Sequence, residues 1–295
     1  MEVKQVTKAI DDQIVLQNIS FQLKQGEITA LIGRNGVGKT TLFSTISGIY
    51  TADSGEILIN GVNLAVNPAL KRQIFFLEDS MNYFNTYNVK AVVKLYKSIY
   101  LDFDEESFAN LLARFDMNEK TKIISFSKGR KALFFMILAF SLNVKYLLLD
   151  EPLEGLDVLI KKELLAFLKE QAREKGTSIL IASHRLDELE TIADRVLLLK
   201  GTGLELDLYL DTLRAETLKI QVAFRTKGVP DFVKKEAQLL SRNGRIYTIF
   251  ISNEVDAFTA RLEEEKPILY EELVMTIEDV FQLYLTEEKI DYLEL

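Results

Sequence analysis

The alternation of apolar and polar positions along the chain predicts an α/β core. Short apolar runs bounded by turn-forming residues cover residues 15–23, 26–33 and 55–61, and such runs are typical of β-strands. Two further runs, at residues 145–150 and 178–183, are continuously apolar and enclose a helical pattern. Apolar strands joined through a helix are typical of buried parallel strands in βαβ units. The pattern therefore predicts a parallel sheet covered by helices.

Two segments depart from this alternation. Residues 88–142 have apolar positions at helical spacing, which predicts a helical insertion in the α/β core. Beyond Leu199, residues 201–207 are interpreted as a turn, and strand and helix patterns follow them. The strand patterns cover residues 218–224, 244–252 and 267–274, and the helical patterns cover residues 256–265 and 276–285. We therefore expect an α/β domain over residues 1–205 and a small α+β appendix over residues 206–295.

Composition places the chain among ordinary globular proteins and excludes several classes of function. The chain has 295 residues, of which 48% are apolar and 27% charged, and it has no cysteine, so disulfides and thiolate metal sites are excluded. The first residues lack the apolar stretch of a secretory signal. The apolar run at 132–144 is shorter than the roughly 20 residues that a membrane-spanning helix needs. The net charge of −8 argues against a nucleic-acid partner, so we expect a cytoplasmic protein without one.

Residues 33–40, GRNGVGKT, form a candidate phosphate loop. They match the pattern G-x-x-x-x-G-K-[ST], follow an apolar strand pattern and open a helical one. Backbone amides of such a loop and the start of the helix attract phosphate oxygens, and the lysine neutralises the β and γ phosphates. The threonine hydroxyl is a ligand for Mg²⁺. We expect nucleotide contacts from Gly33, Asn35, Gly36, Gly38, Lys39, Thr40 and Thr41. A glycine-rich turn that fits the pattern by chance is the alternative.

Polar residues that follow the two continuous apolar runs are candidates for the chemistry. Asp150 and Glu151 come at the end of the first run, and His184, the only histidine, follows the second. In doubly wound sheets, ligands bind where parallel strands end. Asp150 is therefore expected in the Mg²⁺ shell, Glu151 beside the attacking water and His184 at the γ-phosphate. Without the phosphate loop, a solvated acidic turn and a structural histidine would be the simpler interpretations.

These motifs occur in a fixed order with two more, Ser127-Lys128-Gly129-Arg130 and Glu154-Gly155-Leu156-Asp157. Over residues 1 to about 205 the chain resembles the ATP-binding subunits of ABC transporters. The resemblance implies a P-loop NTPase fold, with ATP and Mg²⁺ as cofactors and Lys39, Glu151 and His184 as catalytic residues. It also implies a homodimer or heterodimer of two ATP-binding subunits, in which Ser127 and Gly129 of one close over the phosphate loop of the other.

The chain departs from the family pattern at several positions. The signature usually reads LSGGQ, and its form here resembles the variant in bacterial peptide and antibiotic exporters. Glu78 stands where a glutamine contacts Mg²⁺ or the attacking water, and we expect it in the metal site. Ile10 stands where an aromatic residue stacks on adenine. Glu154 replaces a small polar residue.

The resemblance implies a motor that drives a separate transmembrane permease from the inner face of the membrane, with a peptide or lipid-like molecule as the exported substrate. A soluble ABC ATPase of DNA repair or translation is an alternative, but the chain has one phosphate loop and lacks room for a long coiled coil before the signature. A catalytically dead scaffold conflicts with the intact motifs. Residues 79–87, which include Tyr83, Phe84 and Tyr87, are interpreted as the permease docking surface. The alternative is that these rings fold back onto the helical insertion.

Overall fold

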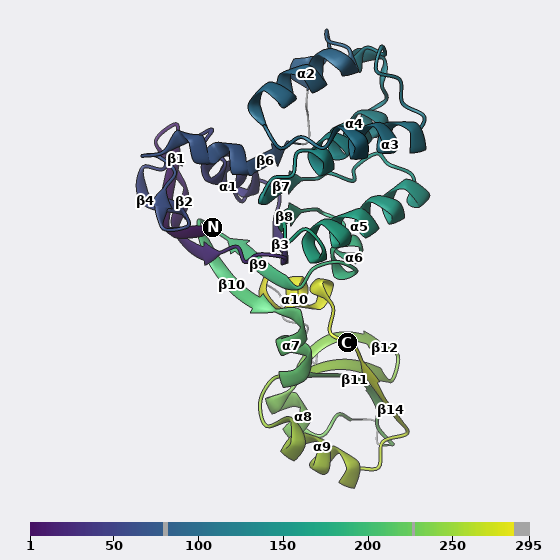
Figure 1. Cartoon of the computed structure of the whole chain (residues 1–295). Helices are drawn as coiled ribbons and strands as arrows, with labels where there is room; N and C mark the ends of the chain where they lie inside the picture. The colour runs from purple at the N-terminus through teal and green to yellow at the C-terminus, as the bar shows by residue number, and fades with distance from the viewer. Residues whose placement is uncertain (79–81, 226–227, 286–295) are drawn as a thin grey trace. The chain divides into compact units, whose positions relative to one another are not determined.

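The computed structural model describes residues 1–78, 82–225 and 228–285. The chain forms two compact units, Met1–Asp207 and Leu208–Leu295 (Figure 1). The domain boundary expected at residue 205 falls inside strand β10, Gly203–Tyr209. Within these ranges, the first unit contains two sheets and the second contains one, and each unit has its own buried core.

A six-stranded sheet forms the centre of the first unit. Its order is β10-β9-β3-β8-β7-β6, and β3, β6, β7, β8 and β9 pair in parallel. The bounds of these strands are β3 Ile28–Gly33, β6 Ile74–Leu77, β7 Tyr146–Asp150, β8 Ser178–Ala182 and β9 Arg195–Lys200. Leu149 pairs with Ile181 and Asp150 with Ala182, so β7 and β8 end at the same edge. The predicted parallel sheet is confirmed.

One prediction for this sheet is wrong. Residues 201–207 were expected to form a turn, but the structure confines the turn to Gly201 and Thr202 and forms strand β10 next to β9. The reason is visible in the sequence, because leucines at 204, 206 and 208 alternate with acidic residues. Such alternation is typical of a strand with one covered face.

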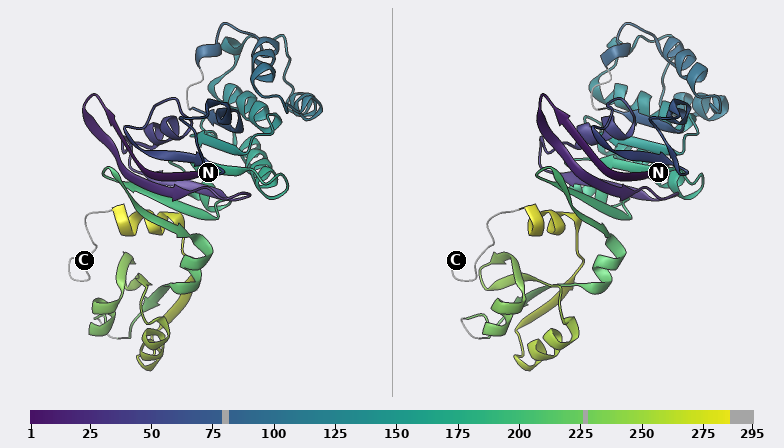
Figure 2. Two further views of the ribbon diagram at one scale, coloured as in Figure 1. Left: turned by 60° about the vertical axis from the view of Figure 1, so that its left-hand side comes forward. Right: turned by 90° about the vertical axis from the view of Figure 1, so that its left-hand side faces the viewer.

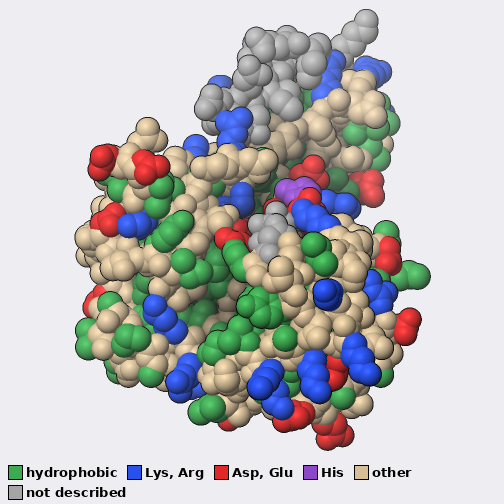
Figure 3. Space-filling view, turned by 90° about the horizontal axis from the view of Figure 1, so that it is seen from above, with side chains coloured by type: hydrophobic (Ala, Val, Ile, Leu, Met, Phe, Trp, Pro, Cys, Tyr) green, Lys and Arg blue, Asp and Glu red, His purple; other side chains and the backbone are tan. Residues whose placement is uncertain are grey.

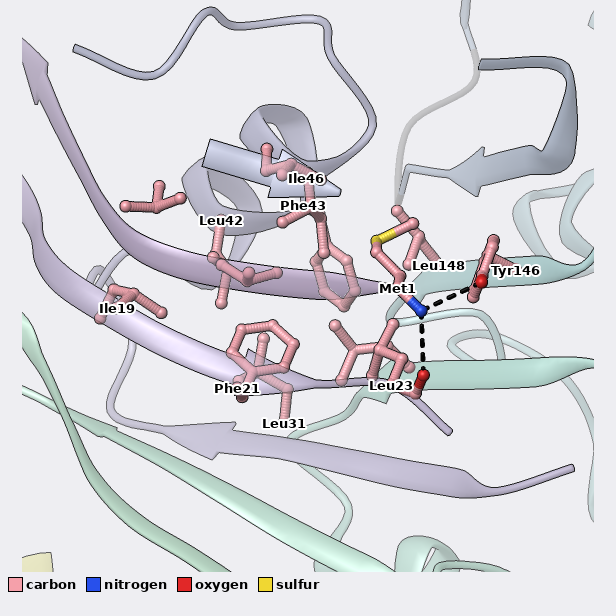
Figure 4. Packing of buried hydrophobic residues seen from close by; sticks show 14 of the residues in the cluster. Met1, Ile19, Phe21, Leu23, Leu31, Leu42, Phe43, Ile46, Tyr146 and Leu148 are labelled. Carbon is pink, nitrogen blue, oxygen red and sulfur yellow. Dashed lines mark hydrogen bonds between the residues drawn. The ribbon is translucent and has the colours of Figure 1, made fainter. Parts of the chain in front are cut away.

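A second, antiparallel sheet packs against the phosphate-loop helix α1, Lys39–Ile46. Its order is β2-β1-β4-β5. The bounds are β1 Glu2–Ile10, β2 Gln13–Gln22, β4 Ser54–Ile59 and β5 Val62–Asn63. Figure 4 shows the core between the layers, where Phe21 of β2 and Phe43 of α1 lie with residues of the central sheet. The backbone amine of Met1 donates to the carbonyl of Leu23 at 3.1 Å and to the hydroxyl of Tyr146 at 3.0 Å.

Four helices of the first unit begin at residues whose side chains cap them. The helical insertion holds α2 Val89–Ile99, α3 Glu105–Arg114 and α4 Lys128–Ser141, while α5 Val158–Arg173 and α6 Leu186–Glu190 follow strands β7 and β8. The side chains of Asn88, Asp104, Ser127 and Asp157 accept backbone N–H bonds at the starts of α2 to α5. Figure 2 shows the insertion, in blue and teal, as a helical lobe beside the sheet. The predicted insertion is confirmed.

Helix α4 contains most of the apolar run that the sequence places at 132–144. Its residues from Leu133 to Ser141 are all buried inside the first unit. Burial inside the protein thus explains why this run is apolar. Among the described residues, none of the helices combines the length and apolar character that crossing a membrane requires.

The second unit contains a four-stranded antiparallel sheet of order β12-β13-β11-β14. Its elements follow one another as β11 Leu218–Ala223, α8 Asp231–Glu236, β12 Gln238–Asn243, β13 Ile246–Ile251, α9 Val255–Glu264 and β14 Leu269–Leu273. This βαββαβ arrangement is the ferredoxin-like one. Helix α7, Leu210–Glu216, precedes it and α10, Ile277–Leu285, follows it. The predicted α9, α10, β11, β13 and β14 are confirmed, whereas α7, α8 and β12 were not predicted.

Candidate functional site

The phosphate loop connects β3 to α1 and is shaped by close packing. Gly38 is the N-cap of α1, with φ of 106°, and no side chain caps the helix. A Cβ atom on Gly38 would lie 2.8 Å from the Val15 side chain, and one on Gly33 would lie 2.8 Å from the Leu199 carbonyl oxygen. Glycine is therefore required at both positions. The first turn of α1 has no acidic residue, so its N–H groups suit an anion.

Lys39 lies over this loop at the start of α1. Its ammonium group donates to the carbonyl oxygens of Gly33 at 2.9 Å and Arg34 at 3.3 Å. Burial lowers the pKa of Lys39, and the carboxylates of Glu151 and Asp150 oppose this shift. The lysine thus holds its positive charge between the loop and the two acidic residues.

Thr40 and Asp150 meet at the candidate metal position. The Thr40 hydroxyl donates to Oδ2 of Asp150 at 2.5 Å, and Asp150 is only 5% exposed at the end of β7. Glu78 directly follows β6, whose Leu77 pairs with Leu149, so Glu78 lies at the same edge of the sheet. Across the described ranges, no group of three or more His, Cys, Asp or Glu residues converges on one point. A cation at Thr40 and Asp150 would therefore take further ligands from phosphate and water, as Mg²⁺ does.

Glu151 and His184 form a hydrogen-bonded pair beside this position. Nδ1 of His184 lies 2.9 Å from Oε2 of Glu151, and the Glu151 amide donates to the Ala182 carbonyl. Glu151 has φ of 51°, a left-handed conformation that is uncommon for a residue with a side chain. Burial raises the pKa of Glu151, and the hydrogen bond and charge of His184 oppose the rise. Figure 3 shows the histidine, in purple, beside acidic and basic side chains.

The signature residues and the loop before α5 form a second local group. Ser127 is the N-cap of α4, and its Oγ accepts from the Arg130 amide at 3.2 Å. A Cβ atom on Gly129 would collide with the Gly155 carbonyl, so the two backbones touch. Lys128 and Glu154 form an ion pair at 2.6 Å. The structure thus gives Ser127 a capping role and joins the signature to the second motif.

Two features of the site carry no signal in the sequence. Val15 of β2 contacts the phosphate loop at Gly38, whereas Ile10, the residue expected at the adenine base, lies at the end of β1 and pairs with Gln13. Lys161 of α5 and Glu188 of α6 form a partly buried ion pair at 2.8 Å, which links α5 to the helix that follows His184. Both arise from pairing between elements distant in the chain.

The aromatic segment after β6 is only partly exposed. Residues 79–81 lie outside the described residues, and a 3₁₀ turn follows at Asn82–Phe84. The Phe84 ring is half-buried and packs near Tyr96 of α2 and Phe135 of α4, with centroid distances of 5.9 and 5.8 Å. Tyr83 and Tyr87 remain 63% and 52% exposed. Phe84, expected in the docking surface, therefore belongs to the packing of the insertion, because its ring lies against the rings of Tyr96 and Phe135.

Comparison with known proteins identifies the family. The model of the family described as ABC transporter matches residues 16–154. The chain is 34% identical over 281 residues to ABC transporter ATP-binding protein YtrB of Bacillus subtilis, covering 95% of this chain and 96% of the relative. The chain belongs to the ATP-binding subunits of ABC transporters. Members of this family bind and hydrolyse ATP, and that activity is assigned to this chain.

Further relatives of the ABC chain cover parts of it. Spermidine/putrescine import ATP-binding protein PotA of Mycoplasma mycoides is 33% identical over 68% of this chain, which spans 59% of that protein. A solved ATP-binding subunit of an ABC transporter has a TM-score of 0.67 and 30% identity, over 72% of this chain and 91% of that one. A dimeric cassette with ADP and Pi, at 20% identity and a TM-score of 0.62, covers 70% of this chain and 97% of that one and shares the fold. The α/β P-loop fold is thus confirmed.

Proposed function

We propose that this chain is the motor of an ABC transporter that closes as a dimer around ATP and Mg²⁺ and drives a separate permease. The observation that carries the proposal is the meeting of five side chains at one edge of the central sheet. They are Lys39, Thr40, Asp150, Glu151 and His184.

Each of these residues has a distinct role in the proposal. The charge of Lys39 neutralises the β and γ phosphates, while Thr40 and Asp150 hold Mg²⁺ with Glu78 near it. Mg²⁺ would neutralise charge that develops on the phosphates. Glu151 polarises the attacking water, and His184 fixes the Glu151 carboxylate through their hydrogen bond.

The second local group serves the partner subunit. Ser127 and Gly129 lie at the start of α4, where the helix presents its positive end to an anion. We place the phosphate loop of a second copy, or of a related subunit, against this surface. Two nucleotides would then be enclosed between two subunits.

The partner and the direction of transport belong to the same proposal. Tyr83 and Tyr87 face solvent beside the helical insertion, and we propose them as anchors for a permease at the inner face of the membrane. The variant signature supports an exporter of peptides or lipid-like molecules. Transport into inside-out vesicles that contain the permease would support this direction, and uptake into right-side-out vesicles would overturn it.

The dimer is tested by trapping it. Glu151→Gln removes the charge that acts on water but keeps the volume and the phosphate contacts, so we expect hydrolysis to fall at least about 100-fold while ATP binding persists. ATP should then convert this variant from monomer to dimer in sedimentation velocity. Lys39→Ala is the matched control, since it should lose both binding and dimerisation. A Glu151→Gln protein that turns over ATP normally, or stays monomeric with saturating ATP, contradicts the proposal.

A further inference from the structure

Two departures from the family pattern lie against each other in the structure. Lys128 stands where the signature usually has glycine, and Glu154 stands where a small polar residue precedes Gly-Leu-Asp. Nζ of Lys128 lies 2.6 Å from Oε2 of Glu154, although 26 positions separate them. Two positions that are usually small in the family thus carry opposite charges here, and the two side chains are in contact.

The backbone holds this pair at a fixed location. Gly129 and Gly155 pack so closely that a Cβ atom on Gly129 would collide with the Gly155 carbonyl. Lys128 follows the helix cap Ser127, and Glu154 precedes the tight turn at Gly155, which has φ of 76°. Both charges are therefore carried by segments that cannot move apart freely.

The fold has little need of this pair. The side chains of Lys128 and Glu154 are 54% and 41% exposed. An ion pair as exposed as this one contributes little to folding, because water screens both charges. Its larger effect is on the charge of the surface that carries Ser127.

The local charge is unfavourable for the isolated subunit and suited to a polyanion. The first turn of α4 contains Lys128, Arg130 and Lys131 and no acidic residue, at the helix end that repels cations. Arg130 donates to the Asp116 carbonyl, and Lys131 donates to Oδ1 of Asn85 at 2.8 Å. Glu154 supplies a formal negative charge beside them.

We propose that Glu154 masks the ammonium of Lys128 and that this ammonium moves to the terminal phosphate of ATP bound by the partner subunit when the dimer closes. Glu154 then weakens closure and Lys128 strengthens it, so the pair sets the ATP concentration at which the dimer forms. A diphosphate lacks the terminal phosphate and leaves Lys128 on Glu154. This inference rests on the dimer proposed above.

The test measures ATP-driven dimerisation of the full chain in the Glu151→Gln background by sedimentation velocity. We expect Glu154→Gln to lower the ATP concentration for half-dimerisation about threefold to fivefold, because it unmasks the ammonium. Lys128→Met should raise that concentration about fivefold or more, because it leaves a carboxylate facing a phosphate. The double variant should return to within about twofold of the starting value.

The opposite signs of the two single changes are decisive. If the pair only fastened the two loops together, both single variants would weaken closure by similar factors, and that result overturns the proposal. Glu105→Gln is a matched control, since it removes the carboxylate of the exposed Lys97–Glu105 pair in the insertion and should leave closure unchanged. If the Glu151→Gln parent itself stays monomeric with ATP, both the proposed dimer and this inference are overturned. If the parent dimerises but Glu154→Gln has no effect, only this inference fails.

Discussion

Glu151 combines two features that do not favour folding. Its backbone adopts a left-handed conformation, and its carboxyl group is buried enough to raise its pKa. Backbone conformations of this kind persist when surrounding contacts enforce them, and here the Glu151 amide is bonded to Ala182 of β8. We interpret this arrangement as the way the protein aims the carboxylate at a reacting water.

The raised pKa of Glu151 predicts the pH dependence of hydrolysis. The reaction needs the carboxylate form, so the rate should fall as pH decreases through a pKa above the usual value of about 4.3 for glutamate. His184→Gln removes the charge that opposes the rise, so the acid limb of the pH–rate profile should move to higher pH in that variant. Steady-state ATPase rates between pH 4.5 and 8, measured in both proteins at saturating ATP, check this, and a limb that moves to lower pH contradicts it.

The same pKa shift predicts a change in stability with a definite sign. A carboxyl group whose pKa is raised in the folded state stabilises the fold below its unfolded pKa, and this contribution is lost as pH rises through the folded pKa. At pH 7 the Glu151 charge is therefore unfavourable for folding. Glu151→Gln should raise the melting temperature at pH 7, on the order of 1–2 °C, and should do so less at pH 4. Differential scanning calorimetry at both pH values measures it, and a lower melting temperature at pH 7 would count against burial as the dominant cause.

The segment that follows β6 contains one aromatic ring that packs inside the insertion and two that are exposed. The Phe84 ring fills space between α2 and α4, whereas Tyr83 and Tyr87 are exposed. Replacing Tyr83 and Tyr87 together by Ser should leave stability within about 0.5 kcal/mol, since exposed substitutions rarely matter to folding. The double variant should retain ATPase activity in isolation but lose most of its recovery with permease-containing membranes.

Phe84→Ser is the contrasting variant for this segment. It empties a half-buried aromatic position, so we expect it to lower the free energy of unfolding by about 2 kcal/mol. Urea denaturation compares the three proteins, and co-sedimentation with membranes compares their binding. If the tyrosine pair binds membranes like the parent, the docking surface lies elsewhere.

At the scale of the whole molecule, the nucleotide site belongs to the first unit. The residues named in the proposed reaction and the signature all lie within Met1–Asp207, and the βαββαβ fold of the second unit has a core of its own. A fragment of residues 1–209, which keeps β10 whole, should therefore fold and bind ATP within about twofold of the full chain. Isothermal titration with ATP measures this. A fragment that folds, as judged by circular dichroism, but no longer binds ATP would show that the second unit completes the site.

Features that depend on contiguous residues could be predicted from the sequence. The phosphate loop and the helix that follows it are contiguous in the chain, so the residues GRNGVGKT are sufficient to predict their structure. Continuous apolar runs predicted the buried parallel strands, because such strands are covered on both faces. The prediction of a turn at residues 201–207 is wrong, because the structure has β10 there. Elements β1, β6, β9, α6, α7, α8 and β12 were also not predicted, and all of these except β1 are short.

Contacts between side chains that are distant in the chain could not be predicted in this way. The register of the parallel strands places Thr40 beside Asp150 across 110 positions and Glu151 beside His184 across 33. Packing of α4 against the loop before α5 creates the Lys128–Glu154 pair, and packing of the insertion turns Phe84 inward while leaving Tyr83 outside. Such contacts depend on the order of the strands and on how the helices pack. Neither can be predicted from a short stretch of sequence around one residue. The candidate site residues can thus be identified from short motifs, whereas the hydrogen bonds and ion pairs between them depend on the fold.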